Sequence, residues 1–397
     1  MVDFQTIAAV VFLVILTIFV FLKRKSLDTK QIIPYFLYFS MYRTKFGLKL
    51  MDFFAKKYRK AVIYIGYLGI LVGFLGMILI SYGLISNIYV LFTKPEATPG
   101  VGLVLPFKAK GIFYVPFFYW IISIFIIAVV HEFSHGLIAR ANNLKVKSSG
   151  FAFLALVVPI IPAAFVEPDE KELRKRSHKE QLSVFAAGPF ANIAIAFLFV
   201  AIASFILAPV ANAVIEPNGV KVADYVKGRD KLKFPAEMAG IKIGEVIQQV
   251  DNNPTPYVEN LSTSLRSKKP NDAVIIKTDK SSYEIKLAKN PDNESQAYIG
   301  AYLEQSTKIK DGIKASYGEF LPNALIWAYG LFVILVVLNF GIGLFNLVPI
   351  GPLDGGRMLQ LALHRIFDKE KGDKYWYYVG MFFLILIFIN IFAGFVK

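Results

Sequence analysis

Long apolar runs alternate with polar and basic segments along the chain, and six of these runs are long enough to cross a bilayer. A membrane-spanning helix needs about 20 predominantly apolar residues in succession. The runs predict helices over Thr6–Leu22, Ala61 to about Phe92, about Phe113 to Ala141, about Leu182 to Leu207, about Phe320 to Asn346 and about Tyr377 to Val396. Because no small-residue cleavage site follows the first run, we expect an anchor there rather than a removed signal peptide.

One polar segment of about ninety residues, Ile215–Leu303, separates the fourth and fifth runs. Its β-branched stretches Val274–Thr278 and Tyr283–Leu287 predict short strands joined by turns. The run Phe234–Ile247 resembles the core of a bacterial-type PDZ domain, and Gln248–Pro254 resembles its next strand and turn. PDZ domains bind an extended peptide as an added strand, so the resemblance implies a peptide ligand. The alternative is a packing or gating module without a peptide ligand.

The composition places most of the chain in a bilayer. Hydrophobic residues make up 55% of the sequence and charged residues 18%, whereas soluble domains are about a quarter charged. A soluble enzyme, a disordered protein and a disulfide-stapled secreted domain are therefore excluded. Cysteine is absent, which also excludes thiol catalysis, iron–sulfur clusters and a thiolate metal site. A transition-metal site in this chain must use His, Asp or Glu.

Basic residues crowd into three loops, and their positions predict the orientation of the chain. There are 44 Lys and Arg against 29 Asp and Glu, which gives a formal net charge of +15. The basic stretches are residues 23–60, 145–179 and 357–374. Cytoplasmic loops carry the excess of Lys and Arg, so both termini and the polar segment are predicted to be extracytoplasmic. The basic loops of a cell-membrane protein thus explain the positive net charge, and no nucleic-acid partner is needed to account for it.

The segment HEFSH, residues 131–135, directly follows the apolar run Tyr119–Val130. Two histidines at i and i+4, His131 and His135, lie on one helical face and can share a metal ion. Ionisable residues inside a spanning helix are energetically expensive and mark functional sites by default. Catalytic zinc takes three protein ligands and an activated water, and Glu132 can serve as the general base for that water. The sequence therefore predicts a catalytic zinc site.

HExxH supplies two ligands, so a third must come from elsewhere in the chain. The remaining histidines are poor candidates, because His178 lies in a basic loop and His364 follows the end of an apolar helix. Asp354 is the better candidate. It lies in the Pro- and Gly-broken segment Asn346–Arg357, and irregular backbone at membrane depth is tolerated only in protein or beside a wet cavity. The predicted orientation brings this segment and HExxH to the same cytoplasmic depth.

Two further motifs accompany the HExxH helix and the distant N-x-x-P…L-D-G pattern of Asn346–Gly355. Ala187–Asn192 (AGPFAN) opens the fourth apolar run, and Phe165–Glu170 (FVEPDE) precedes it. Together the motifs resemble those of the site-2 protease family of intramembrane zinc metalloproteases, with its G-x-x-x-N motif and the segment after its β-hairpin. A PDZ domain inserted between two core helices is also a family arrangement. The resemblance covers about Phe113 to Arg357.

The resemblance implies a polytopic α-helical membrane protein of about six transmembrane helices. A small α/β PDZ-like extracytoplasmic domain and a membrane-associated β-hairpin over Phe151–Val166 complete this fold. Together with the hydropathy pattern it predicts two N-terminal helices with a basic loop (1–112), the first half of a catalytic core (113–214), the PDZ-like domain (215–305), and the second half of the core with a C-terminal helix (306–397). The implied partners are transmembrane protein substrates and the lipid bilayer.

Site roles also follow from the resemblance. His131, His135 and Asp354 would ligate Zn²⁺, and Glu132 would be the catalytic carboxylate in hydrolysis of peptide bonds within or near transmembrane segments. Asn192 and Asn346 would bind the substrate backbone or support the oxyanion. A structural alternative for both is hydrogen bonding between helices, which is common for Asn in lipid.

Other classes of membrane protein fit the sequence less well. An aspartyl intramembrane protease needs G-x-G-D, but Gly341-Ile342-Gly343 is followed by Leu344. A serine type needs Ser and His on facing helices, and the only closely spaced His pair belongs to HExxH. A transporter usually shows internal repeats, and none is convincing here. The remaining alternative is a non-catalytic metal-binding membrane protein or regulator, which would typically lack Glu132 or a ligand.

Overall fold

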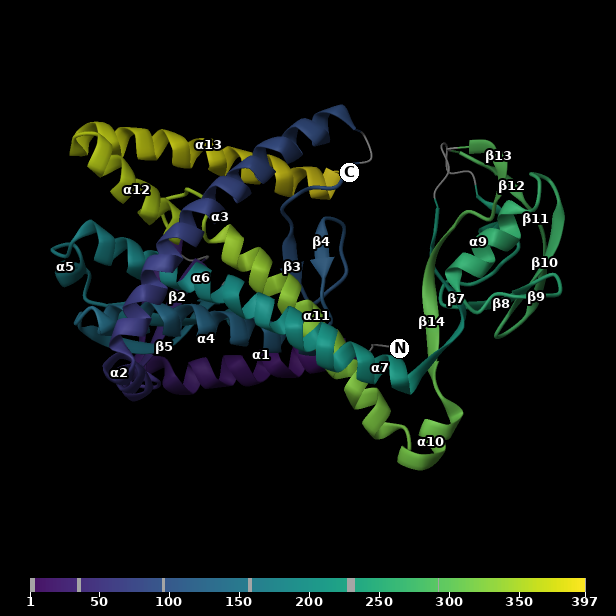
Figure 1. Cartoon of the computed structure of the whole chain (residues 1–397), viewed down its shortest axis with the longest axis horizontal. Coiled ribbons are helices and arrows are strands. Elements are labelled where there is room, and N and C mark those ends of the chain that lie inside the picture. Colours follow the sequence, from purple (N-terminus) through teal and green to yellow (C-terminus); the bar gives the residue numbers. More distant parts are fainter. Residues whose placement is uncertain are drawn as a thin grey trace. The chain divides into compact units, whose positions relative to one another are not determined.

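The computed structural model describes residues 4–33, 37–94, 97–155, 159–226, 233–291 and 293–396 (Figure 1). The chain forms two compact units. The first combines Met1–Ala203 with Gly330–Lys397, and the second is Ser204–Tyr329. The second unit contains the polar segment that the hydropathy pattern separates from the rest of the chain.

Six helices within the described ranges are long and apolar enough to cross a membrane, which confirms the predicted polytopic helical architecture. They are α1 (Phe4–Lys23), α3 (Arg59–Thr93), α4 (Phe117–Ala141), α6 (His178–Ile202), α11 (Phe320–Phe345) and α13 (Lys369–Val396). Helix α6 continues through a π-helical turn into α7 (Ala208–Val214). A shorter helix, α12 (Asp354–Ile366), lies between α11 and α13 in the sequence.

Glycines along one face of α3 allow close packing of the helices that carry the chemistry. The buried glycines of this helix are Gly66, Gly69, Gly73 and Gly76. A Cβ at Gly73 would lie 2.7 Å from Met358 Cε of α12, and one at Gly76 would lie 2.5 Å from Leu347 Cδ1. Small residues let helices approach closely in a bilayer, where packing rather than hydrophobic burial drives association. Helix α3 therefore supports the segment that leads into Asp354.

A four-stranded antiparallel sheet has the order β1-β2-β5-β6. The predicted hairpin corresponds to β5 (Val146–Ala155) and β6 (Pro159–Pro168), and residues 156–158 at its tip lie outside the described residues. The strands β1 (Leu27–Ile33) and β2 (Leu37–Thr44) come from the basic stretch that the sequence indicated only as a loop. Since β2 pairs along β5, with Tyr42 opposite Phe151, the hairpin is half of a larger sheet. The sheet leaves β6 as an edge strand.

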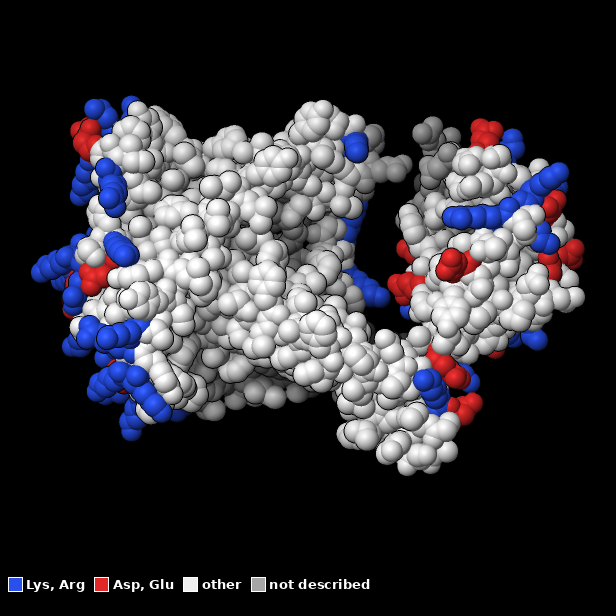
Figure 2. Space-filling view, viewed as in Figure 1, with Lys and Arg blue, Asp and Glu red and all other residues white. Residues whose placement is uncertain are grey.

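Lys and Arg side chains gather at one end of the helical unit, around α2 (Leu48–Lys57), α5 (Glu170–Leu173) and α12 (Figure 2). All three predicted basic loops contribute to this end.

The second unit is built on an antiparallel sheet of order β11-β10-β8-β7-β14. Its strands and short helices are β7 (Ile215–Tyr225), α8 (Pro235–Met238), β8 (Val246–Val250), β9 (Asn253–Pro254), α9 (Val258–Arg266), β10 (Ala273–Thr278), β11 (Ser282–Lys286), β12 (Ala288–Asn290), β13 (Asn293–Tyr298), β14 (Ala301–Ile309) and α10 (Asp311–Tyr317). The two predicted strands are present as β10 and β11, with Val274 opposite Ile285. Val220, Ile247, Leu261 and Ile276 are fully buried in its core.

An ion pair stabilises one edge of this core. Lys268 Nζ lies 2.6 Å from Asp251 Oδ2, and the Ile275 backbone N–H donates to Asp251 Oδ1 over 2.9 Å. Both contacts favour the charged carboxylate, Lys268 the more strongly, and hold the pKa of Asp251 below its ordinary value. The resulting stability is present above the pKa of the unfolded chain and is lost as the pH falls through the folded pKa.

Candidate metal centre

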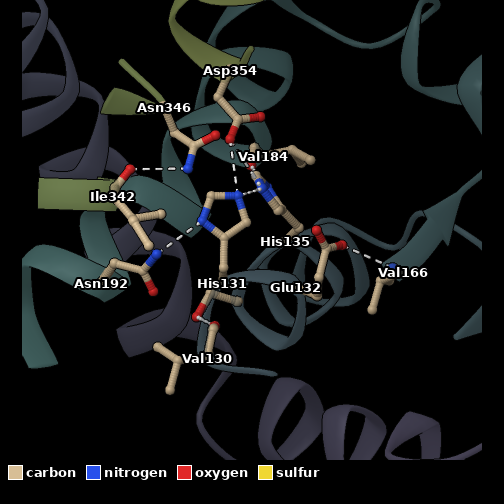
Figure 3. A network of polar contacts seen from close by, with 11 residues as sticks. Val130, His131, Glu132, His135, Val166, Val184, Asn192, Ile342, Asn346 and Asp354 are labelled. Atoms are coloured by element: carbon tan, nitrogen blue, oxygen red, sulfur yellow. Dashed lines mark hydrogen bonds and ion pairs between the residues drawn. The ribbon is translucent and has the colours of Figure 1, made fainter. Parts of the chain in front are cut away.

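Two histidines from α4 and one aspartate from α12 bring three donor atoms together (Figure 3). Asp354 Oδ2 lies 3.1 Å from His131 Nε2 and 3.3 Å from His135 Nε2. The two Nε2 atoms are 3.1 Å apart. The structure therefore assembles the two histidines of HExxH with the carboxylate chosen as third ligand. This is the only group of three or more His, Asp or Glu donors suited to a metal among the residues described.

The donor spacing is a test of whether a metal ion fits. Tetrahedral zinc with bonds of about 2.0–2.1 Å places its ligand atoms about 3.3 Å apart. The observed separations of 3.1–3.3 Å agree with that geometry. Two imidazole nitrogens and one carboxylate oxygen also make a donor set typical of catalytic zinc, which keeps its fourth position open. The residues present fit a zinc ion.

Close backbone approaches hold Asp354 at the start of α12. The Gly355 N–H donates to the Asn346 carbonyl over 2.8 Å. A Cβ at Gly355 would lie 2.1 Å from the Leu347 carbonyl oxygen, so only glycine allows this approach. The next carbonyl, that of Gly356, accepts from Trp376 Nε1 of α13 over 2.9 Å. The Pro- and Gly-rich segment is thus connected to its surroundings by hydrogen bonds and close backbone contacts.

Helix α6 supplies the groups that orient both imidazoles. His135 Nδ1 lies 2.6 Å from the Val184 carbonyl oxygen, which accepts its proton and leaves Nε2 free for a metal. Asn192 Nδ2 lies 3.2 Å from His131 Nδ1. Asn192 is fully buried, and its Oδ1 has no hydrogen-bond partner among the described residues. Turning the amide over would let Oδ1 accept from His131 Nδ1–H, the tautomer that a metal on Nε2 requires.

Gly188 of α6 faces His131 Nε2 and His135 Nε2 directly. A Cβ built at Gly188 would lie 2.4 Å from His135 Nε2 and 2.6 Å from His131 Nε2. Separations below about 3.0 Å are not tolerated between real Cβ atoms and their neighbours. The glycine of the AGPFAN motif therefore provides the space for the imidazoles and an ion.

Glu132 lies beside the donor group without belonging to it (Figure 3). Its Oε2 accepts from the Val166 backbone N–H of β6 over 2.8 Å. A carboxylate can accept several hydrogen bonds, so this contact leaves capacity for a water or a leaving group. The edge strand thereby fixes the position of the carboxylate next to the metal centre.

A small apolar cavity of about 70 Å³ adjoins Glu132. Helix α4 contributes Phe125, Val129 and Phe133 to its wall. The strands and the start of α2 contribute the rest, namely Thr44, Phe46, Gly47, Met51, Ser149, Gly150, Phe151, Ala164, Phe165 and Val166. The cavity offers an apolar side chain a place next to the carboxylate.

Glu167, the next residue on β6, ties this edge to the rest of the sheet. Ser148 Oγ donates to Glu167 Oε2 over 2.7 Å, and Arg43 Nε lies 3.3 Å from the same oxygen. The Ser148 hydrogen bond, helped by the Arg43 charge, holds the pKa of Glu167 below its ordinary value. The contact aligns β2, β5 and β6 beside the site.

The other predicted residues occupy distinct positions. Asn346 Nδ2 donates to the Ile342 carbonyl over 3.0 Å, and Figure 3 shows its amide on the Asp354 side of the centre. His178 begins α6, and His364 Nε2 lies 2.8 Å from Asp373 Oδ1, so neither histidine joins the donor group. The sequence did not reveal the Val184 carbonyl or the Val166 N–H, because backbone groups carry no residue-type signal.

Comparisons with known proteins agree with this site. The model of peptidase family M50 matches residues 119–387, so the chain belongs to this family, the site-2 protease family of zinc metalloproteases. An uncharacterized protein of Methanocaldococcus jannaschii is 28% identical over 70% of this chain and 64% of its own length. Zinc metalloprotease Rip1 of Mycobacterium tuberculosis, like that of Mycobacterium bovis, is 22% identical over 40% of this chain and 47% of its own length. The chain thus spans less than two thirds of these relatives.

Among solved structures, the PDZ domain of an SdrC-like protein from Listeria monocytogenes matches 22% of this chain and 87% of its own length. The identity is 25% and the TM-score is 0.19.

Proposed function

We propose that this protein is an intramembrane zinc metalloprotease that hydrolyses peptide bonds within or near the transmembrane segments of other membrane proteins. One observation carries the proposal: the donors of His131, His135 and Asp354 converge at zinc spacing beside Glu132. A non-catalytic metal protein would not need a carboxylate anchored next to its ligands. Membership of a peptidase family supports the same reaction.

Each residue of the site is given a separate role in the proposed hydrolysis. His131, His135 and Asp354 would hold a zinc ion, which would supply Lewis-acid chemistry for the scissile carbonyl and the attacking water. Glu132 takes the proton of the attacking water and returns it to the leaving amine. The Val184 carbonyl keeps the proton of His135 on Nδ1. Asn192 does the same for His131 once its amide is turned so that Oδ1 faces Nδ1. Both Nε2 lone pairs then face the centre.

The edge strand β6 gives an unwound substrate a place to bind. The Val166 N–H points away from β5 toward Glu132, and residues two apart on a strand point the same way. Ala164 therefore also presents its backbone polar groups on this side. Strand addition there places an extended substrate beside Glu132, with an apolar side chain in the adjoining cavity. Asn346 is proposed to contact the substrate backbone, whereas the burial of Asn192 supports a role in orienting His131.

Replacing the third ligand tests this function. We expect Asp354→Ala to hold less than one zinc per chain and to lose cleavage of a membrane-embedded reporter, because two imidazoles alone bind zinc weakly. Zinc is measured by mass spectrometry of purified protein, and cleavage by gel assay in proteoliposomes. Asp311→Ala, an exposed carboxylate of the second unit, is the matched control.

Full zinc and normal cleavage in Asp354→Ala would show that Asp354 is not a ligand. A wild type with full zinc that cleaves no reporter would favour the non-catalytic alternative.

The basic end of the helical unit is proposed to face the cytoplasm, with both termini and the PDZ-like domain on the other side. The absence of native cysteine makes single-cysteine labelling unambiguous. We expect a membrane-impermeant maleimide to label Lys280→Cys in intact cells and to label Lys175→Cys only after permeabilisation. Both positions are exposed. The opposite labelling pattern would reverse the proposed orientation. A peptide ligand of the PDZ-like domain remains a proposal from its sequence.

A further inference from the structure

A second and larger cavity opens at the basic end of the helical unit, away from the metal donors. Its volume is 540 Å³, within the range of roughly 300–1,000 Å³ that is usual for small-molecule sites. Helices α2, α3, α4 and α5 contribute to its walls, together with the connection between α4 and β5. Its lining residues are Asp52, Ala55, Lys56, Arg59, Arg140, Asn143, Leu144, Lys145 and Glu172.

The cavity is lined by more cationic side chains than carboxylates, and some of the cations form no ion pair with a described residue. Glu172 Oε1 lies 2.8 Å from Arg176, which is outside the cavity lining, and Asp52 Oδ1 lies 3.3 Å from Arg140 Nε. Within the part of the chain that the structure describes, no ion pair involves Lys56, Arg59 or Lys145. The cavity therefore carries an excess of positive charge that an anion would neutralise.

Two arginines are fixed in place around this excess charge. Arg59 Nε donates to the Ala141 carbonyl over 2.9 Å, and Arg140 donates through an Nη atom to the Val146 carbonyl over 3.2 Å. Arg140 Nε is buried, and although Asp52 is near, it has no hydrogen-bond acceptor among the described residues. A guanidinium fork matches the oxygens of a phosphate.

The position of the cavity, at the ends of two candidate spans, favours a lipid as its ligand. Arg59 is the first residue of α3 and Arg140 lies in the last turn of α4, so the cavity lies where two candidate spans leave the apolar region. Beside it, α2 buries Leu48, Met51 and Ala55 while exposing other apolar side chains. The exposed ones are Leu50 (51%) and Phe53 (50%), and Phe46 (76%) lies just before the helix. A short amphipathic helix with exposed Phe and Leu among lysines is typical of the boundary between headgroups and acyl chains.

We propose that this cavity binds the phosphate of an anionic phospholipid headgroup. Lys56, Arg59 and Lys145 contact the phosphate oxygens, and the acyl chains lie along the exposed apolar side chains of α2. Basic pockets between transmembrane helices at the cytoplasmic side recognise such headgroups. The site is separate from the metal centre, and its occupancy can be measured without proteolytic activity.

Native mass spectrometry of the full chain in detergent tests the site, with phosphatidylglycerol or phosphatidylcholine of identical acyl chains added. We expect wild type to retain phosphatidylglycerol in preference, and Lys56→Gln/Lys145→Gln to bind it about thirtyfold more weakly, at about 1 kcal/mol for each charge removed. This variant keeps the Arg59 hydrogen bond. Arg174→Gln/Lys175→Gln removes the same charge from exposed positions at the same end and is expected to bind like wild type. Unchanged zinc content shows that each variant is folded.

Three outcomes would overturn the proposal. The pocket variant could bind phosphatidylglycerol as tightly as wild type, or both variants could weaken equally, which would indicate diffuse surface attraction. Inorganic phosphate provides the third arm. If it binds wild type but not the pocket variant, while wild type shows no preference for phosphatidylglycerol, the ligand is a soluble phosphate and not a lipid. Preference for phosphatidylglycerol that only the pocket variant loses supports the lipid site.

Discussion

Glu132→Gln is expected to retain one zinc per chain and to lose cleavage of a membrane-embedded reporter by about 10²–10⁴-fold, the usual contribution of a general acid–base group. The amide has nearly the shape of the carboxylate, and its oxygen can still accept the Val166 N–H that now bonds Glu132 Oε2 over 2.8 Å. It cannot take a proton from water. Zinc should stay because Glu132 does not belong to the group of His131, His135 and Asp354.

Glu180→Gln is the matched control for this experiment. Glu180 closes a capping box with Ser177 at the start of α6, and Gln performs the same capping role. The same chemical change there should leave both zinc and cleavage near wild type. Undiminished cleavage by Glu132→Gln, in a preparation free of other proteases, would remove Glu132 from the reaction. Loss of zinc in that variant would make Glu132 a ligand or a structural support for the ligands.

The three residues proposed as metal ligands could be predicted because each obeys a local rule. His131 and His135 share a helical face by their spacing, and the depth of Asp354 follows from counting spans. The groups of other elements that contact His135 and Glu132 follow no such rule. The Val184 carbonyl and the Val166 N–H are backbone groups, and only tertiary packing brings them within 2.6 Å of His135 and 2.8 Å of Glu132.

The sheet beside the site could likewise be predicted only in part from the sequence. The hairpin of β5 and β6 was expected from the family resemblance, and its two strands are adjacent in the sequence. The pairing of β2 with β5 joins residues more than a hundred positions apart, such as Tyr42 and Phe151, across two spans. The high density of Lys and Arg in residues 23–60 also conceals the strand Leu37–Thr44, whose charged residue Arg43 is paired with Asp28 and Glu167. Pairing between distant strands is therefore visible only in the fold.

Gly188→Ala is expected to remove zinc and cleavage together while α6 stays folded. The added methyl group would lie 2.4 Å from His135 Nε2 and 2.6 Å from His131 Nε2, where the ligand lone pairs and the ion must be. The helix itself should not suffer, since Ala is favoured over Gly in a helix interior by about 1 kcal/mol. Gly83→Ala on α3 is the matched control, because no atom lies within 4 Å of its added Cβ. Zinc content, cobalt(II) absorption and reporter cleavage should all fall in Gly188→Ala and hold in Gly83→Ala. A Gly188→Ala protein with one zinc per chain would mean that the imidazoles bind the metal on a side away from α6.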